Sequence, residues 1–123
     1  MNFDFQRIDR AFRRGTVMPD GVARLTKTTL VLSADIARKL RSAAYKTTTG
    51  LEGIHVGILY DARNQAFKFY PDPENGFAFF RNGDDADAPY RTTGLPAALN
   101  RAAPVTGDYV EVPGEVLVYQ LQR

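Results

Sequence analysis

Hydrophobic and polar residues alternate along much of the chain, a pattern typical of β-strands that bury one face. Thr, Val and Leu residues at 22–25 and 28–32 predict two short strands. The alternating residues at 54–60 predict a third strand, and the segment AFKFYP at 66–71 predicts a fourth after the turn ARNQ. The third and fourth strands should therefore form a hairpin.

A helical period replaces the alternation directly after the second strand. Ile36 and Leu40, with alanines a turn later, form an apolar stripe. Ser33 is a typical N-cap residue, and Asp35 would place a negative charge beside the positive end of the helix dipole. We expect a helix that begins after Ser33 and ends at the segment TTTGLEG.

The second half of the chain repeats this order in outline. An aromatic strand at 76–82 is followed by an acidic loop, a short helix at 95–103, and strands at 108–112 and 115–121. Both halves read strand, helix, strand, strand, although their sequence identity is negligible. The pattern predicts one compact α+β domain over 1–123, with small antiparallel sheets from two strand-helix-hairpin halves at 22–73 and 77–121.

Composition narrows the class of protein. The 123 residues, 44% hydrophobic and 24% charged, are typical of a single globular domain. No apolar run approaches the ~20 residues of a membrane span, and the N-terminus lacks the apolar core of a signal peptide, so we expect a soluble, cytoplasmic protein. The absence of Cys excludes disulfides, thiol catalysis and Cys-ligated zinc.

Charge is distributed unevenly along the chain. Residues 1–50 hold ten Lys or Arg against four Asp, whereas residues 51–123 hold six against ten acidic residues. Clustered cations indicate a surface for a polyanion, because they release condensed counterions when they meet phosphates; a solvated basic face is the alternative. The candidate nucleic-acid-binding residues are Arg7, Arg10, Arg13, Arg14, Arg24, Lys27, Arg38, Lys39 and Arg41.

A group of aromatic residues between 67 and 80 allows two interpretations. They could stack bases on a sheet, as in proteins that bind single strands. They could also fill the core, which is the favoured interpretation because a chain without Trp needs Phe in its interior. The residues are Phe67, Phe69, Tyr70, Phe77, Phe79 and Phe80.

Motifs for catalysis or metal binding are missing from the sequence. His55 is the only His, and no Gly-x-Ser-x-Gly or Gly-rich phosphate loop occurs. The segment GDDADAP has three Asp but neither the spacing nor the closing Glu of a calcium loop. We therefore predict a non-enzymatic protein without metal or cofactor, while Arg side chains and backbone amides could still hold an anionic ligand.

The order of a strand, a Ser-capped helix and a hairpin, TLVL to HVGILYDARNQAFKFYP, resembles the swapped-hairpin domains of AbrB- and MraZ-type transcription factors over residues 22–71. That resemblance implies an AbrB-like fold, a basic strand and loop before the helix, and a DNA-binding homodimer. Two features differ: Lys39 stands where the helix signature has Arg, and TTLVLS replaces the usual Ile-Pro. The layout, including YVEVPGEVLVYQL, also resembles small proteins of bacterial viruses.

Two hypotheses for function follow. The first is a DNA-binding regulator or accessory protein that acts as a homodimer and that a bacterial virus could encode. The second is a viral interaction protein that sequesters a host protein or an anionic nucleotide-like ligand, in which case it would act in the host cytoplasm.

Overall fold

The structure is a computed structural model that describes residues 18–44, 53–81, 87–92 and 94–122. The elements in chain order are β1 (Val22–Leu25), β2 (Leu30–Leu32), α1 (Ala34–Ala44), β3 (Gly53–Asp61), β4 (Ala66–Pro71), β5 (Phe77–Arg81), β6 (Tyr90–Thr92), α2 (Ala97–Arg101), β7 (Gly107–Glu111) and β8 (Val118–Leu121). The strand expected at 22–25 and the hairpin of 54–60 with 66–71 are present as β1, β3 and β4, while β6 was not expected.

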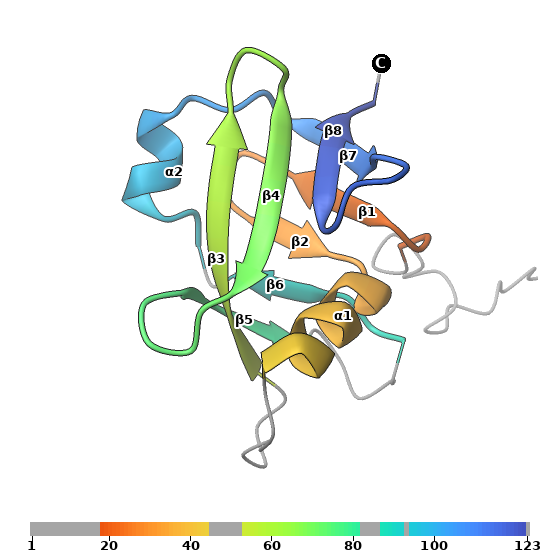
Figure 1. The fold of residues 1–123 in the computed structure, drawn as a ribbon. Coiled ribbons are helices and arrows are strands. Elements are labelled where there is room, and N and C mark those ends of the chain that lie inside the picture. Colours follow the sequence, from red (N-terminus) through yellow and green to blue (C-terminus); the bar gives the residue numbers. More distant parts are fainter. Residues whose placement is uncertain (1–17, 45–52, 82–86, 93, 123) are drawn as a thin grey trace, which may run out of the picture.

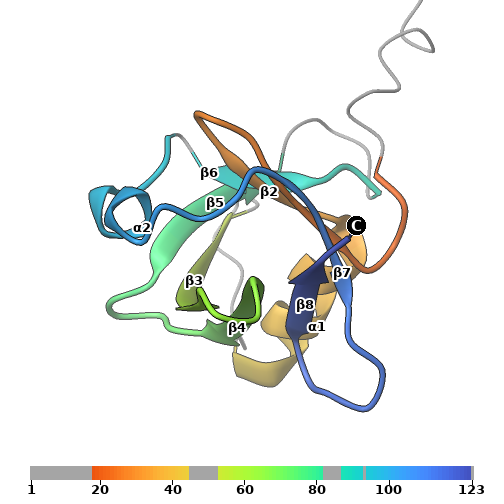
Figure 2. The ribbon, with the colours of Figure 1, turned by 90° about the horizontal axis from the view of Figure 1, so that it is seen from above.

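The strands form one closed antiparallel barrel in the order β1-β2-β6-β5-β3-β4-β8-β7 (Figures 1 and 2). The expected α+β, AbrB-like domain with small separate sheets is therefore wrong. Local alternation indicated the hairpins, but the pairings β2–β6, β4–β8, β3–β5 and β1–β7 join them into a single sheet. Every described strand pairs on both sides, so a second copy of the chain is not needed to close the barrel.

The two halves of the chain contribute equivalent parts of the barrel. Each half supplies two strands, a helix and two further strands. If β1, β2, β3 and β4 are exchanged with β5, β6, β7 and β8, the set of pairings stays the same: β2–β6 and β4–β8 are unchanged, and every other pairing becomes one that is also present. The halves meet at four pairings, β2–β6, β3–β5, β4–β8 and β1–β7, and in the first of them Val31 lies opposite Arg91.

The barrel interior is filled by side chains rather than open. Phe67, at its centre, is fully buried and lies with its ring centroid 4.6 Å from that of Tyr109 and 5.7 Å from that of Phe69. Phe79 is fully buried as well, whereas Phe77 is partly buried. Most of the predicted core aromatics are thus in the core, but Tyr70 and Phe80 are exposed.

Helix α1 covers one end of the barrel (Figure 1). Ile36 and Leu40 are completely buried, as the apolar stripe predicted. The helix begins directly after Ser33, whose carbonyl oxygen accepts hydrogen bonds from the N–H groups of Ile36 and Ala37. Strand β2 runs into α1 without a linker because the helix lies across the barrel end at which the strand stops. The predicted helix end at 47–53 falls largely outside the described residues.

The side chains of Ser33 and Asp35 attach the start of α1 to β1. The Ser33 hydroxyl accepts a hydrogen bond from the Val22 N–H at 3.2 Å and donates one to the Asp35 carboxylate at 2.5 Å. Both carboxylate oxygens of Asp35 lie 3.0 Å from the Gly21 nitrogen. Gly21 has a φ of +72°, a conformation that favours glycine. This network fixes the entry of β1 against the first turn of α1.

Among the described residues, the hydroxyl of Tyr119 is buried without a hydrogen-bond partner. We expect Tyr119→Phe to leave the protein as stable or to raise the free energy of unfolding by roughly 1 kcal/mol, because an unsatisfied buried hydroxyl is costly. Urea denaturation measures this difference. A less stable variant would contradict it and would mean that the hydroxyl has a partner in solution.

The same variant should alter the response to alkali. Burial, with a smaller contribution from Asp35 and Glu111, raises the pKa of Tyr119 above its ordinary value. Stability is therefore complete below the pKa of an unfolded tyrosine, about 10, and falls above it because the unfolded chain loses its proton first. The melting temperature of the Phe variant should decline less between pH 9 and pH 11 than that of the parent, roughly the window around that pKa.

Candidate nucleic-acid interface

The nine predicted cations do not form one surface in the part of the chain that the structure describes. Arg7, Arg10, Arg13 and Arg14 lie outside the described residues. Arg38, Lys39 and Arg41 lie on α1, and Arg24 and Lys27 belong to β1 and to the turn that follows it. The cations of α1 and those of β1 and its turn are therefore considered as two separate groups.

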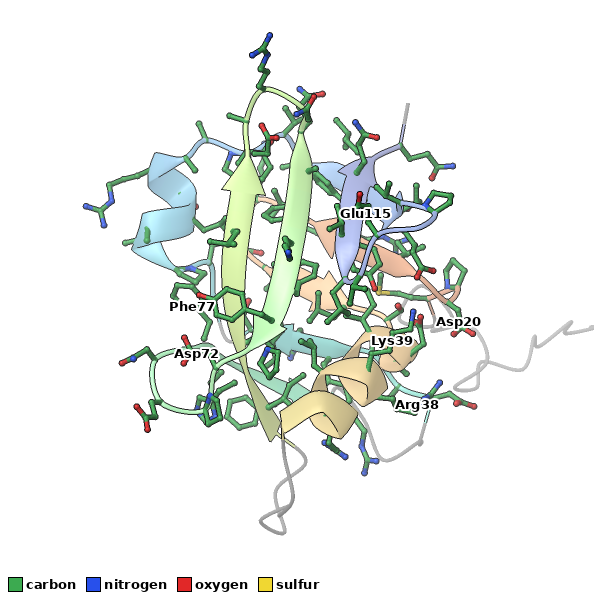
Figure 3. The ribbon with its side chains drawn as sticks, viewed as in Figure 1. Asp20, Arg38, Lys39, Asp72, Phe77 and Glu115 are labelled. Atoms are coloured by element: carbon green, nitrogen blue, oxygen red, sulfur yellow. The ribbon has the colours of Figure 1, made fainter. Side chains whose placement is uncertain are left out.

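The cations of α1 have partners within the protein. Lys39 Nζ lies 3.0 Å from Glu111 Oε1, and Arg38 Nη1 lies 3.5 Å from Asp87 Oδ1. Arg41 Nη2 donates a hydrogen bond to the Tyr90 hydroxyl at 2.8 Å. In Figure 3, Arg38 and Lys39 project from the outer side of the helix. Their acidic partners reduce the positive potential of α1, so this helix is a poor candidate for a phosphate surface.

Arg24 also has an acidic partner, and its side chain lies on the outer wall of the barrel. Its Nε lies 2.7 Å from Asp108 Oδ1 and its Nη2 lies 3.2 Å from Asp108 Oδ2, a bidentate arrangement. The hydrogen bond to Asp108 raises the pKa of Arg24. Both side chains remain about one third exposed, at 35% and 36%. Arg24 is therefore held in a fixed direction on the surface.

Lys27 is exposed at the turn between β1 and β2. The hydroxyl of Thr26 accepts hydrogen bonds from the N–H groups of Thr28 and Thr29, at 3.3 Å and 3.0 Å. These bonds define the turn and place Lys27 at its tip, next to the strand that carries Arg24.

The strand register reveals a row of outward-facing residues that crosses six strands. Arg24 lies opposite Asp108 on β7 and opposite Val31 on β2. Val31 lies opposite Arg91 on β6, and Arg91 lies opposite Phe80 on β5. Phe80 in turn lies opposite Gly53 on β3. We call this set the outer row: Asp108, Arg24, Val31, Arg91, Phe80 and Gly53.

Arg91 was missed by the sequence analysis. It lies in β6, a three-residue strand within a segment interpreted as an acidic loop. Its flanking residues Tyr90 and Thr92 are buried, while Arg91 is exposed. The signal in the sequence was a charged residue between Tyr90 and Thr92, but three residues are too few to show a strand period.

Phe80 has an unusual environment for a large apolar residue. It is 43% exposed, and its ring lies over Gly53 of the neighbouring strand. A Cβ atom at position 53 would lie 3.1 Å from two carbons of the Phe80 ring, so the ring packs closely on the bare backbone. The ring is thus supported by β3 and is flanked on its other side by Arg91.

Tyr70 is a second exposed aromatic residue, at 38%, and lies over Gly57 of the same strand. A Cβ atom on Gly57 would overlap its ring. The chain between β4 and β5 crosses β3 between the two rings, because Asp72 N–H bonds to the His55 carbonyl and Gly76 packs on the backbone of residues 55 and 56. Asp72 and Phe77, at the two ends of this crossing, are labelled in Figure 3.

A separate apolar pocket of about 210 Å³ lies beneath α2. Ile58, Tyr60 and Phe77 line it from the barrel, and Ala98, Leu99 and Ala102 line it from the helix side. The pocket arises because β5 pairs only with residues 53–56 of β3, so α2 rather than a strand covers the rest of that edge.

Within residues 18–44, 53–81, 87–92 and 94–122, no cluster of three or more acidic or His residues could hold a metal ion. In the same residues no helix is long and apolar enough to cross a membrane.

The chain matches no known protein family, curated protein or solved structure.

Proposed function

We propose that the protein is a non-enzymatic nucleic-acid-binding protein whose contact surface is the outer row together with Lys27. The observation that carries this proposal is the register, which places Arg24 on β1 and Arg91 on β6 with only Val31 of β2 between them, and the turn bearing Lys27 directly follows β1. Asp108 is the only acidic member of the row, and it is paired with Arg24. The outer row and Lys27 together therefore retain net positive charge.

Several properties support this surface over α1. Within the described residues Lys27 and Arg91 form no ion pair, unlike Arg38 and Lys39, and both are exposed on short, hydrogen-bonded elements. Cations on a rigid sheet lose less conformational entropy on binding phosphate than cations on a loop. Binding would be sensitive to salt and would show little dependence on base sequence, because phosphate contacts carry no sequence information.

Replacing Lys27 and Arg91 together with Ala should weaken nucleic-acid binding and lower the slope of log affinity against log salt by about two units, roughly one unit per lost phosphate contact. The slope is measured by fluorescence anisotropy at several salt concentrations. Folding should hardly change, because exposed substitutions usually alter stability by about 0.5 kcal/mol or less.

The matched control is the double variant Lys68→Ala with Arg101→Ala. It removes the same charge from exposed positions on β4 and α2, away from the outer row. It should retain most of the salt slope. Equal effects of the two double variants would show a general charge effect and would contradict the proposed surface. Absence of binding at low salt would refute the function itself.

The alternative function, capture of a host protein or an anionic nucleotide-like ligand, would use the same cations. Mass spectrometry of molecules released by heat from the purified protein distinguishes it. A bound nucleotide, combined with no affinity for DNA or RNA, would favour this alternative.

A further inference from the structure

We infer that the nucleic acid recognised by the outer row is single-stranded and that one of its bases stacks on Phe80. This inference rests on the proposed function and adds the class of substrate. Phosphate contacts alone would not distinguish a single-stranded nucleic acid from a duplex. The distinguishing feature is an aromatic ring placed among the cations.

The ring of Phe80 is suited to stacking because its position is fixed. It lies in a strand of the barrel wall, and the backbone of Gly53 supports it. A side chain at position 53 would push against the ring, so glycine allows the ring to lie close to the sheet. With 43% of the residue exposed, the ring can receive a base on its open side.

Charge complementarity identifies the occupant as a strand with a phosphate backbone. Arg91 of β6 lies directly opposite Phe80 in the register. Arg24 lies on β1, two strands beyond Arg91. A base on Phe80 would therefore leave its backbone beside these guanidinium groups. Bases within a duplex have their faces covered by their neighbours, whereas the bases of a single strand are free to stack on a protein ring.

Tyr70 provides an internal comparison. It is similarly exposed and also lies over a glycine of β3. However, it lies on the far side of the crossing that carries Asp72 and Glu74, and its exposed strand neighbour is Lys68 rather than the outer row. Tyr70 pairs with Gly57 and with no residue of the outer row, so Arg24 and Arg91 are not beside it to hold a phosphate backbone. We expect stacking at Phe80 and not at Tyr70.

The chain contains no Trp, so Phe80→Trp places the only Trp of the variant at the proposed stacking position, where its emission can be followed separately from that of the tyrosines. Titration with a thymine oligonucleotide should quench its emission, and a duplex of the same length should cause little quenching. The matched variant Tyr70→Trp should respond weakly to both. Quenching should disappear as salt is raised, because phosphate contacts hold the strand in place.

Affinity measurements with Phe80→Ala and Phe80→Leu complete the test. Loss of one stacked base should weaken single-strand binding about 5- to 150-fold in both variants, while Leu keeps an apolar cover over Gly53 and preserves folding. Tyr70→Ala should bind like the parent. Equal affinity for single strand and duplex, with no quenching at position 80, would overturn the inference and leave the proposed function intact. Absence of binding to both would overturn both.

Discussion

Replacing Phe67 with Ala should lower the free energy of unfolding by about 3–5 kcal/mol, the range for truncating a fully buried aromatic residue. Phe67 has no exposed surface, and its ring lies 4.7 Å from the Tyr60 ring and 4.6 Å from the Tyr109 ring between centroids. These neighbours come from β3 and β7, on different parts of the barrel wall. Their backbones are held by the ladder, so they cannot collapse into the space that the ring leaves.

Urea denaturation followed by circular dichroism measures the change for Phe67→Ala. Val116→Ala is the control, because Val116 is 77% exposed and its truncation should change stability by about 0.5 kcal/mol or less. A loss below about 1 kcal/mol for Phe67→Ala would be outside the range for a packed core and would contradict the filled barrel interior.

Replacing Leu40 with Ala should cost about 2–5 kcal/mol, because the variant leaves a cavity between α1 and the barrel end. Leu40 is completely buried, although it lies on a helix of which the neighbouring residue Lys39 is exposed. One face of α1 therefore belongs to the hydrophobic core, while the opposite face is exposed to solvent. Loss of this contact should loosen the helix and the barrel end together.

The control for this prediction is Lys39→Ala. It removes the ion pair with Glu111 on the outer side of the same helix and should cost about 1 kcal/mol or less, since exposed pairs contribute little. Thermal melting compares the two variants. Similar melting temperatures for Leu40→Ala and the parent would show that α1 is not needed to close the barrel.

The local elements were largely predictable because alternation is a property of neighbouring residues. The strand at 66–71 and the start of α1 after Ser33 agree with the sequence pattern. Strand β6 was not predicted because its three residues are too short for a period, and it lies in a segment rich in Asp and Gly. The helix expected at 95–103 is shorter, at Ala97–Arg101.

The candidate site was only partly predictable. Arg24 and Lys27 were expected from the basic N-terminal half, and Phe80 was among the aromatics considered for base stacking. Their relation to Arg91 depends on the β2–β6 and β5–β6 pairings, which join distant parts of the chain. The acid partners of the cations are equally distant, since Arg24 and Asp108 are separated by 84 positions. The distribution of charge along the sequence does not show that a cation such as Arg24 is paired with a distant acidic residue.

The sequence by itself determined which of the longer segments are extended or helical and which of their side chains share a face, because both depend on the period of apolar residues. Only the tertiary structure decided that the hairpins of the two halves interleave in one closed barrel. It also decided that α1 covers an end of that barrel, and that Arg91 and Phe80 extend the basic strand β1 into a row. The physical reason is that strand pairing is satisfied by backbone hydrogen bonds available on every strand, so partners are selected by packing across the whole interior.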